Sequence, residues 1–107
     1  MTDAPIPEID VHEARRRVEA GAAFLDVREE DEHRAVRTPE AELLPLSGFL
    51  DAWEERVPRD REVLVLCRSG ARSGRVTAFL RERGVEAFNV AGGILDWEAE
   101  GLPVEKG

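Results

Sequence analysis

Cysteine, histidine and long apolar runs are scarce in this sequence of 107 residues, and each scarcity excludes a class of protein. The single cysteine, Cys67, cannot form an internal disulfide or a cysteine-only metal cage, which excludes disulfide-rich secreted scaffolds and zinc ribbons. The two histidines, His12 and His33, lie in highly charged stretches, and neither has a cysteine or a second histidine at ligand spacing. We therefore expect no metal site and place both histidines at the surface.

Every apolar run is too short for a membrane span, which needs roughly 18 residues. Residues 1–10 have neither the basic start nor the apolar stretch of a signal peptide. Basic residues number 15 against 23 acidic ones, and the net charge of −8 opposes general binding to nucleic acid or to an anionic membrane. The sequence thus predicts a cytoplasmic protein whose partners include neither nucleic acid nor membrane.

No repeat, low-complexity tract or linker divides the chain, so we expect a single domain over residues 1–107. Apolar residues at helical spacing alternate with short apolar runs along it. Helices are expected from a capping box of Asp10 and Glu13 to Gly21, from the acidic run at 29–32, from a Ser47 cap to Pro58, from near Ser73 to Gly84, and from Gly92. Strands are expected at 23–27, 42–46, 63–66 and 87–90. The connections are too long for hairpins, which predicts a three-layer α/β domain with a mainly parallel central sheet and helices on both faces.

Apolar patterning also predicts which residues form the core. The run at 63–66 is apolar without alternation, as is typical of a central parallel strand covered on both faces. Two helices are expected to bury one face each, made by Phe49, Leu50, Trp53 and Val57 in the first and by Ile94, Leu95 and Trp97 in the second. The acidic run at 29–32 suits the positive end of a helix dipole, with paired-carboxylate chemistry as the less favoured interpretation.

The segment directly after the central strand is the most informative part of the sequence. It reads Cys67-Arg68-Ser69-Gly70-Ala71-Arg72-Ser73 and leads into a helix. Ligands of open α/β sheets collect beyond the carboxyl ends of strands, where helix N-termini present unpaired backbone N–H groups. The helix N-terminus, loop amides turned toward the sulfur, and the two arginines all favour thiolate over thiol, so we expect a lowered pKa for Cys67.

The remaining residues of this loop suit the same chemistry. Gly70 allows a tight backbone turn, and Ser69 and Ser73 can cap the helix or donate hydrogen bonds. The alternative is a buried structural cysteine, but such a residue does not need two arginines, a glycine and two hydroxyls immediately after it. The segment therefore predicts a cradle for a small anion with a nucleophile at its base.

Two further stretches extend the pattern beyond the loop. Asp26-Val27-Arg28-Glu29 follows a predicted strand, and Asn89-Val90-Ala91-Gly92-Gly93-Ile94-Leu95-Asp96-Trp97 precedes Gly101-Leu102-Pro103 near the end of the chain. With the loop at 67–73, these stretches resemble the single-domain rhodanese family of thiosulfate and related sulfurtransferases over nearly the whole length. Residues 36–41, which read Val36-Arg37-Thr38-Pro39-Glu40-Ala41, depart from the family's Gly-His-Ile-Pro-Gly-Ala, and we expect the departure to alter the rim of the site more than its chemistry.

The resemblance implies a sulfurtransferase that needs no cofactor. Cys67 would take a sulfane sulfur from thiosulfate or a persulfide donor and pass it to cyanide or to a thiol, including a protein thiol. Arg68 would orient the anionic donor and stabilise the departing sulfite, and Arg72 would close the loop or add to the same field. Ser69 stands where thiosulfate enzymes often carry a second basic residue, which favours a protein persulfide as the natural donor.

Two other functions stay open at this point. One is a module that carries sulfur or senses oxidants through Cys67 without turnover. The other, less favoured, is a small phosphatase or arsenate reductase. Phosphatase relatives on a similar fold have one more residue between cysteine and arginine, so the spacing from Cys67 to Arg72 favours sulfur transfer.

Overall fold

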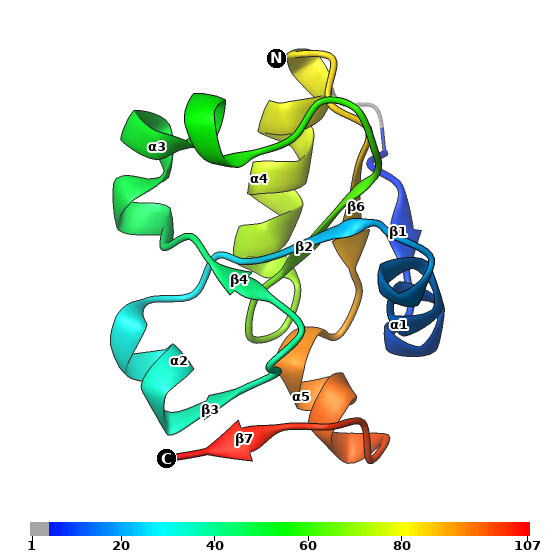
Figure 1. Cartoon of the computed structure of the whole chain (residues 1–107), viewed down its shortest axis with the longest axis vertical. Coiled ribbons are helices and arrows are strands. Elements are labelled where there is room, and N and C mark those ends of the chain that lie inside the picture. The colour runs from blue at the N-terminus through cyan, green and yellow to red at the C-terminus, as the bar shows by residue number, and fades with distance from the viewer. Residues whose placement is uncertain (1–4) are drawn as a thin grey trace.

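Five parallel strands form the central sheet of the computed structural model, which describes residues 5–107 (Figure 1). The strands are β1 (Glu8–Ile9), β2 (Ala23–Asp26), β4 (Glu42–Leu43), β5 (Val63–Leu66) and β6 (Ala87–Val90), in the order β1-β6-β5-β2-β4. The predicted central strand is thus β5, and Leu64 lies beside Phe24 of β2 and Phe88 of β6. The expected α/β class and parallel sheet are confirmed.

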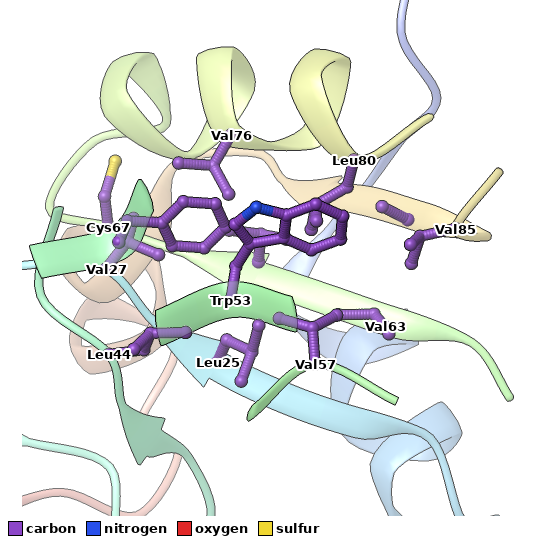
Figure 2. Close-up of a cluster of buried hydrophobic side chains, with 13 residues drawn as sticks. Leu25, Val27, Leu44, Trp53, Val57, Val63, Cys67, Val76, Leu80 and Val85 are labelled. Atoms are coloured by element: carbon purple, nitrogen blue, oxygen red, sulfur yellow. The ribbon is translucent and has the colours of Figure 1, made fainter. Parts of the chain in front are cut away.

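Helices cover both faces of this sheet, as predicted. They are α1 (Val11–Glu19), α2 (Glu30–Ala35), α3 (Phe49–Arg56), α4 (Ala71–Glu82) and α5 (Gly93–Ala99), with one 3-10 turn, η1 (Leu46–Gly48). Trp53 of α3 lies against Val76 and Leu80 of α4 and above the strands (Figure 2). Helices α1 and α5 cover the other face, where Trp97 packs on Phe24 and Leu64. No helix among residues 5–107 is long and apolar enough to cross a membrane.

Alternating side chains of the strands explain how one sheet supports two cores. Val63 and Val65 of β5 face α3 and α4, whereas Leu64 and Leu66 face α1 and α5. Successive residues of a strand point to opposite faces, so a strand covered on both sides must be apolar at every position. The uninterrupted run at Val63–Leu66, buried throughout, meets this requirement and carries Cys67 at its end.

Several details of the predicted helices are wrong. Leu50 and Leu95 are 72% and 44% exposed, because each follows a buried helical residue and is turned about 100° away from the core. Ser47 does not cap α3, whose N-cap is Gly48. Ser47 lies within η1, and its hydroxyl donates to Glu29 at 2.6 Å. The strand expected over 42–46 is shorter than predicted, because β4 ends at Leu43 and η1 already begins at Leu46. Helix α4 begins at Ala71, two residues before the predicted start near Ser73.

Helix starts use the acidic residues in two ways. Asp10 caps α1 as expected, since its Oδ1 accepts a hydrogen bond from the backbone of Glu13 at 2.8 Å. The predicted capping box is wrong in its second half, because the Glu13 side chain does not return this bond and instead pairs with Arg16 and Arg17. A full capping box forms at α2, between Glu29 and Glu32. The acidic run is therefore a helix start, and the paired-carboxylate interpretation has no support in the geometry.

Three short strands escaped the sequence patterns. They are β1, β3 (Val36–Arg37) and β7 (Glu105–Lys106). Strand β1 belongs to the central sheet, whereas β3 and β7 pair antiparallel in a separate two-stranded sheet. Each of the three has two residues, which is too short to show an alternation of apolar and polar side chains. The β3–β7 pair ties the segment after α2 to the C-terminal end of the chain, beside α5 (Figure 1).

A buried ion pair links the end of β2 to α2 and β3. Asp26 and Arg28 are 0% and 2% exposed, and their closest nitrogen and oxygen atoms lie 2.8 Å apart. The guanidinium of Arg28 also donates to the carbonyl oxygens of Val36 at 2.7 Å and of Glu32 at 3.3 Å. Arg28 thereby satisfies its own donors and fixes α2 beside the carboxyl edge of the sheet.

Removing the carboxylate of this pair should be costly, because it leaves the Arg28 charge buried and uncompensated. We expect Asp26→Ala to lower the free energy of unfolding by about 3–5 kcal/mol, measured by urea denaturation. Lys106→Ala is the matched control, since the exposed pair of Lys106 with Glu98 should contribute about 1 kcal/mol at most. Equal losses in the two variants would show that the Asp26–Arg28 pair has no special structural role.

Candidate active site

The sulfur of Cys67 lies at the carboxyl end of β5, at the N-terminus of α4. Gly70 is the N-cap of α4, and its φ of 111° is a conformation that favours glycine. Its backbone N–H donates to the Cys67 Sγ at 3.0 Å, and the Ser73 hydroxyl lies 3.2 Å from the same sulfur. Three residues predicted from the sequence, Cys67, Gly70 and Ser73, are thus brought together around one atom.

Helix α5 sets the orientation of the loop from the opposite side. The backbone N–H of Ile94 donates to the carbonyl of Cys67 at 2.9 Å, and that of Leu95 donates to the carbonyl of Arg68 at 3.2 Å. Because the N–H of a peptide points away from its C=O, these bonds turn the loop amides toward the sulfur. A Cβ on Gly93 would overlap both loop carbonyls, so glycine is needed for this close approach.

The surroundings of Cys67 lower the pKa of its thiol. Burial alone raises that pKa, but hydrogen bonds from the Ser73 hydroxyl and from the backbone N–H groups of Ser73, Gly70 and Ser69 together lower it by more. The direction agrees with the prediction, while the cause is mainly hydrogen bonding and not the two arginines. Cys67 is therefore prepared to act as a nucleophile.

Arg68 is the exposed cation of the loop. Among residues 5–107 it forms no ion pair with a carboxylate, and its side chain borders an open pocket of about 210 Å³ between α2 and α5. Ile94, Leu95 and Val36 line the same pocket. Val36, the first residue of the segment that departs from the family pattern, is thus one of the residues that line the pocket beside Arg68.

The side chain of Arg72 is held by Glu32 of α2. Its two terminal nitrogens donate to the two carboxylate oxygens of Glu32 at 2.6 and 2.7 Å, a bidentate pair. Of the two roles considered for Arg72, this geometry fits closure of the loop. Ser69 and Ala71 are exposed. Ser69 acts on the sulfur through its backbone N–H, and Ala71 is the first residue of α4.

Sequence reasoning missed two residues of the site, Glu32 and Asn89. Asn89 is buried on β6; its amide nitrogen donates to the carbonyl of Gly70 at 3.1 Å, and its amide oxygen lies 2.5 Å from the Ser73 hydroxyl. A polar amide in an otherwise apolar strand was the available signal. Because β5 and β6 are neighbouring parallel strands, their carboxyl ends meet at one edge of the sheet.

Comparison with known proteins shows which family the chain resembles in sequence. Residues 10–100 match the family model described as "Rhodanese-like domain". The chain belongs to the rhodanese family. The resemblance seen in the sequence and the expected rhodanese-like fold are confirmed.

Relatives of this rhodanese-like domain include named sulfurtransferases. It is 35% identical over 82 residues to a sulfurtransferase of Allochromatium vinosum, covering 76% of each chain. It is 33% identical over 105 residues to the thiosulfate sulfurtransferase GlpE of Actinobacillus pleuropneumoniae, covering 92% of each. The crystal structure of a rhodanese-related protein from Thermoplasma volcanium superposes with a TM-score of 0.85 at 30% identity, covering 92% of this chain and 97% of the other.

The pair between Glu32 and Arg72 gives this rhodanese-like domain a specific acid sensitivity. The hydrogen bonds from Arg72, partly opposed by burial, lower the pKa of Glu32 from 4.5 to about 2. A carboxylate with a lowered pKa in the folded state stabilises the fold above its unfolded-state pKa, and this stability is lost as the pH falls toward the folded-state value.

We therefore expect Glu32→Gln to reduce the free energy of unfolding by about 1 kcal/mol at neutral pH. The difference from the unmodified protein should shrink as the pH falls from 4.5 to about 2, because both proteins are then uncharged at this position. Urea denaturation at a series of pH values measures it. Glu30→Gln, an exposed carboxylate on the same helix, is the control; a pH-independent difference for Glu32→Gln would contradict this account.

Proposed function

We propose that this rhodanese-like domain, over residues 1–107, is a cytoplasmic, cofactor-free sulfurtransferase that works through a persulfide on Cys67. The observation that carries the proposal is the buried sulfur at the base of a loop whose amides and Ser73 hydroxyl stabilise negative charge on it. The named sulfurtransferases among its relatives support the same reaction class.

The first half-reaction transfers sulfur to the protein. The Cys67 thiolate attacks the outer sulfur of thiosulfate, a new S–S bond forms, and the original S–S bond breaks with its electron pair leaving on sulfite. A persulfide donor reacts in the same way and releases its thiolate. Thiosulfate is supported as a donor by the relative named thiosulfate sulfurtransferase.

The second half-reaction needs an acceptor from outside the chain. Cyanide or a thiol, including a protein thiol, attacks the outer sulfur and returns Cys67 to the thiolate. The sequence has one cysteine, so no second thiol can resolve the persulfide as an internal disulfide. The transferred sulfur must therefore leave on a separate molecule.

Charge in the loop acts on the donor in this scheme. The backbone N–H groups of Ser69, Gly70 and Ser73 hold the negative charge near the sulfur, and Arg68 at the edge of the pocket binds the anionic end of the donor. Arg72, held by Glu32, keeps the loop closed against α2. Arg68 thus stabilises the sulfite as it departs.

The direct test is transfer of sulfur by the purified protein. We expect thiocyanate from thiosulfate and cyanide, and a mass increase of one sulfur atom on Cys67 after treatment with thiosulfate or a persulfide donor. Cys67→Ser should abolish both, because the thiol forms the intermediate. Colorimetric thiocyanate assay and intact-protein mass spectrometry measure these results.

Other outcomes would redirect the proposal. A stoichiometric sulfur adduct without turnover would favour a carrier or sensor, and Cys67-dependent hydrolysis of p-nitrophenyl phosphate would favour a phosphatase. Neither an adduct nor thiocyanate with any donor would refute sulfur transfer.

Arg68 should be needed for the rate with an anionic donor. We expect Arg68→Ala to lower kcat/KM for thiosulfate by about 10²–10³-fold, because it removes a charge that acts on the departing sulfite. Arg75→Ala is a matched control, since Arg75 is also exposed near the start of α4 but borders a different pocket, against α3. A similar loss in both variants would mean that general positive charge, and not the placement of Arg68, matters.

A further inference from the structure

The hydroxyl of Ser73 lies between two acceptors that compete for its one hydrogen. Its oxygen is 3.2 Å from the Cys67 Sγ and 2.5 Å from the Asn89 Oδ1, and both Ser73 and Asn89 are buried. Ser73 and Asn89 are at most 1% exposed, and a hydroxyl has a single hydrogen to donate. The hydrogen can therefore bond the sulfur or the amide oxygen, but not both.

The amide of Asn89 is held with its oxygen toward Ser73. Its nitrogen donates to the Glu8 Oε2 at 2.8 Å and to the carbonyl of Gly70 at 3.1 Å, so both donor positions are used. The oxygen that remains can only accept. Asn89 is thus a permanent second acceptor for the hydroxyl that also faces the reacting sulfur.

The charge on Sγ changes during the proposed reaction, on which this inference rests. Before sulfur uptake, Sγ is a thiolate and attracts the hydroxyl hydrogen strongly. After uptake, Cys67–S⁻ and thiosulfate have become Cys67–S–S⁻ and sulfite, and the negative charge lies on the outer sulfur. Sγ is then a neutral sulfur and a weak acceptor, so the Ser73 hydroxyl loses its preferred partner.

We propose that the Ser73 hydroxyl switches from Sγ to Asn89 when Cys67 takes up sulfur, and that Asn89 is the positioning residue that makes this switch possible. Asn89 gives the buried hydroxyl a partner in the persulfide state, where it would otherwise be left unsatisfied at a cost. In the unloaded state, Asn89 competes with the thiolate for the same hydrogen. Asn89 therefore favours the sulfur-loaded form over the free thiolate.

Several charged groups surround this switch and must be held constant in any test. Glu8 of β1 bonds Asn89 directly, Arg72 of α4 is paired with Glu32 of α2, and Arg68 lies on the loop itself. A change at Asn89 alters none of these charges if the replacement is neutral. Repeating each Asn89 substitution in a Ser73→Ala variant then shows how much of its effect on the Cys67 pKa depends on the Ser73 hydroxyl.

The experiment is a double-mutant cycle on the pKa of Cys67 in the unloaded protein. Asn89→Ala is made in the natural protein and in a Ser73→Ala background, and the pKa is read from the pH dependence of alkylation by iodoacetamide. Because the chain has one cysteine, alkylation reports on Cys67 alone. Circular dichroism checks that each variant is folded.

The shift that Asn89→Ala causes in the Cys67 pKa is compared between the natural protein and the Ser73→Ala variant. In the natural protein the pKa should fall by about one unit more than in the variant, because the freed hydroxyl then stays on the thiolate. Asn89→Leu, which is neutral and close to asparagine in size but has no acceptor, should give the same relative shift, and it replaces Asn89→Ala if that variant does not fold. Equal shifts with and without Ser73 would overturn the switch and leave Asn89 as a loop clamp.

A second measurement follows the loaded state. At a fixed ratio of thiosulfate to sulfite, the ratio of persulfide to thiolate in Asn89→Ala should be about tenfold lower than in the natural protein, by mass spectrometry. An unchanged ratio would also overturn the switch. If the natural protein forms no persulfide with any donor, the proposed function itself fails. The alkylation experiment is independent of that outcome, because it uses the unloaded protein and no sulfur donor.

Discussion

The site depends on the way α5 holds the two carbonyl groups at the start of the loop. Hydrogen bonds from Ile94 and Leu95 to the carbonyls of Cys67 and Arg68 fix these peptides, and the second one presents its N–H, that of Ser69, to the sulfur. If the peptides turned over, carbonyl oxygens would face Sγ and oppose its ionisation. Ionisation of the sulfur therefore depends first on the orientation of the loop peptides, which α5 sets. It also explains why Gly93 has no room for a Cβ.

Convergence of four elements on one sheet edge makes this arrangement stable. Parallel strands end at the same side, so β5 delivers Cys67 and β6 delivers Asn89 to one place. Helix α2 lies beside this edge, because Arg28 at the end of β2 donates to the carbonyl of Glu32. The carboxylate of Glu32 in turn holds Arg72 of α4. The buried pair of Asp26 and Arg28 is thus linked through α2 to Arg72, at the start of the helix whose N-terminus faces the sulfur.

Local signals predicted the fold class and the loop, and long-range contacts escaped them. The apolar run at Val63–Leu66 and the residues after Cys67 are contiguous, so their pattern is visible in the sequence. Asn89 is 16 residues from Ser73, and Glu32 is 40 residues from Arg72, so only the folded chain shows that they meet. The exposure of Leu50 and Leu95 is a different kind of error, because each directly follows a buried residue and the turn of about 100° per residue already takes it off the buried face.

The charge around the sulfur is divided between two kinds of interaction. Hydrogen bonds from buried groups lower the pKa of Cys67, and they act over a few ångströms in a place that salt does not screen. Arg72 is neutralised by Glu32, which leaves Arg68 as the exposed cation of the loop. In the reaction proposed above, Arg68 would attract the anionic donor within a chain of net charge −8, and this attraction is open to screening by salt. Activation of the nucleophile and capture of the donor would then be physically separate, so that each could change without the other.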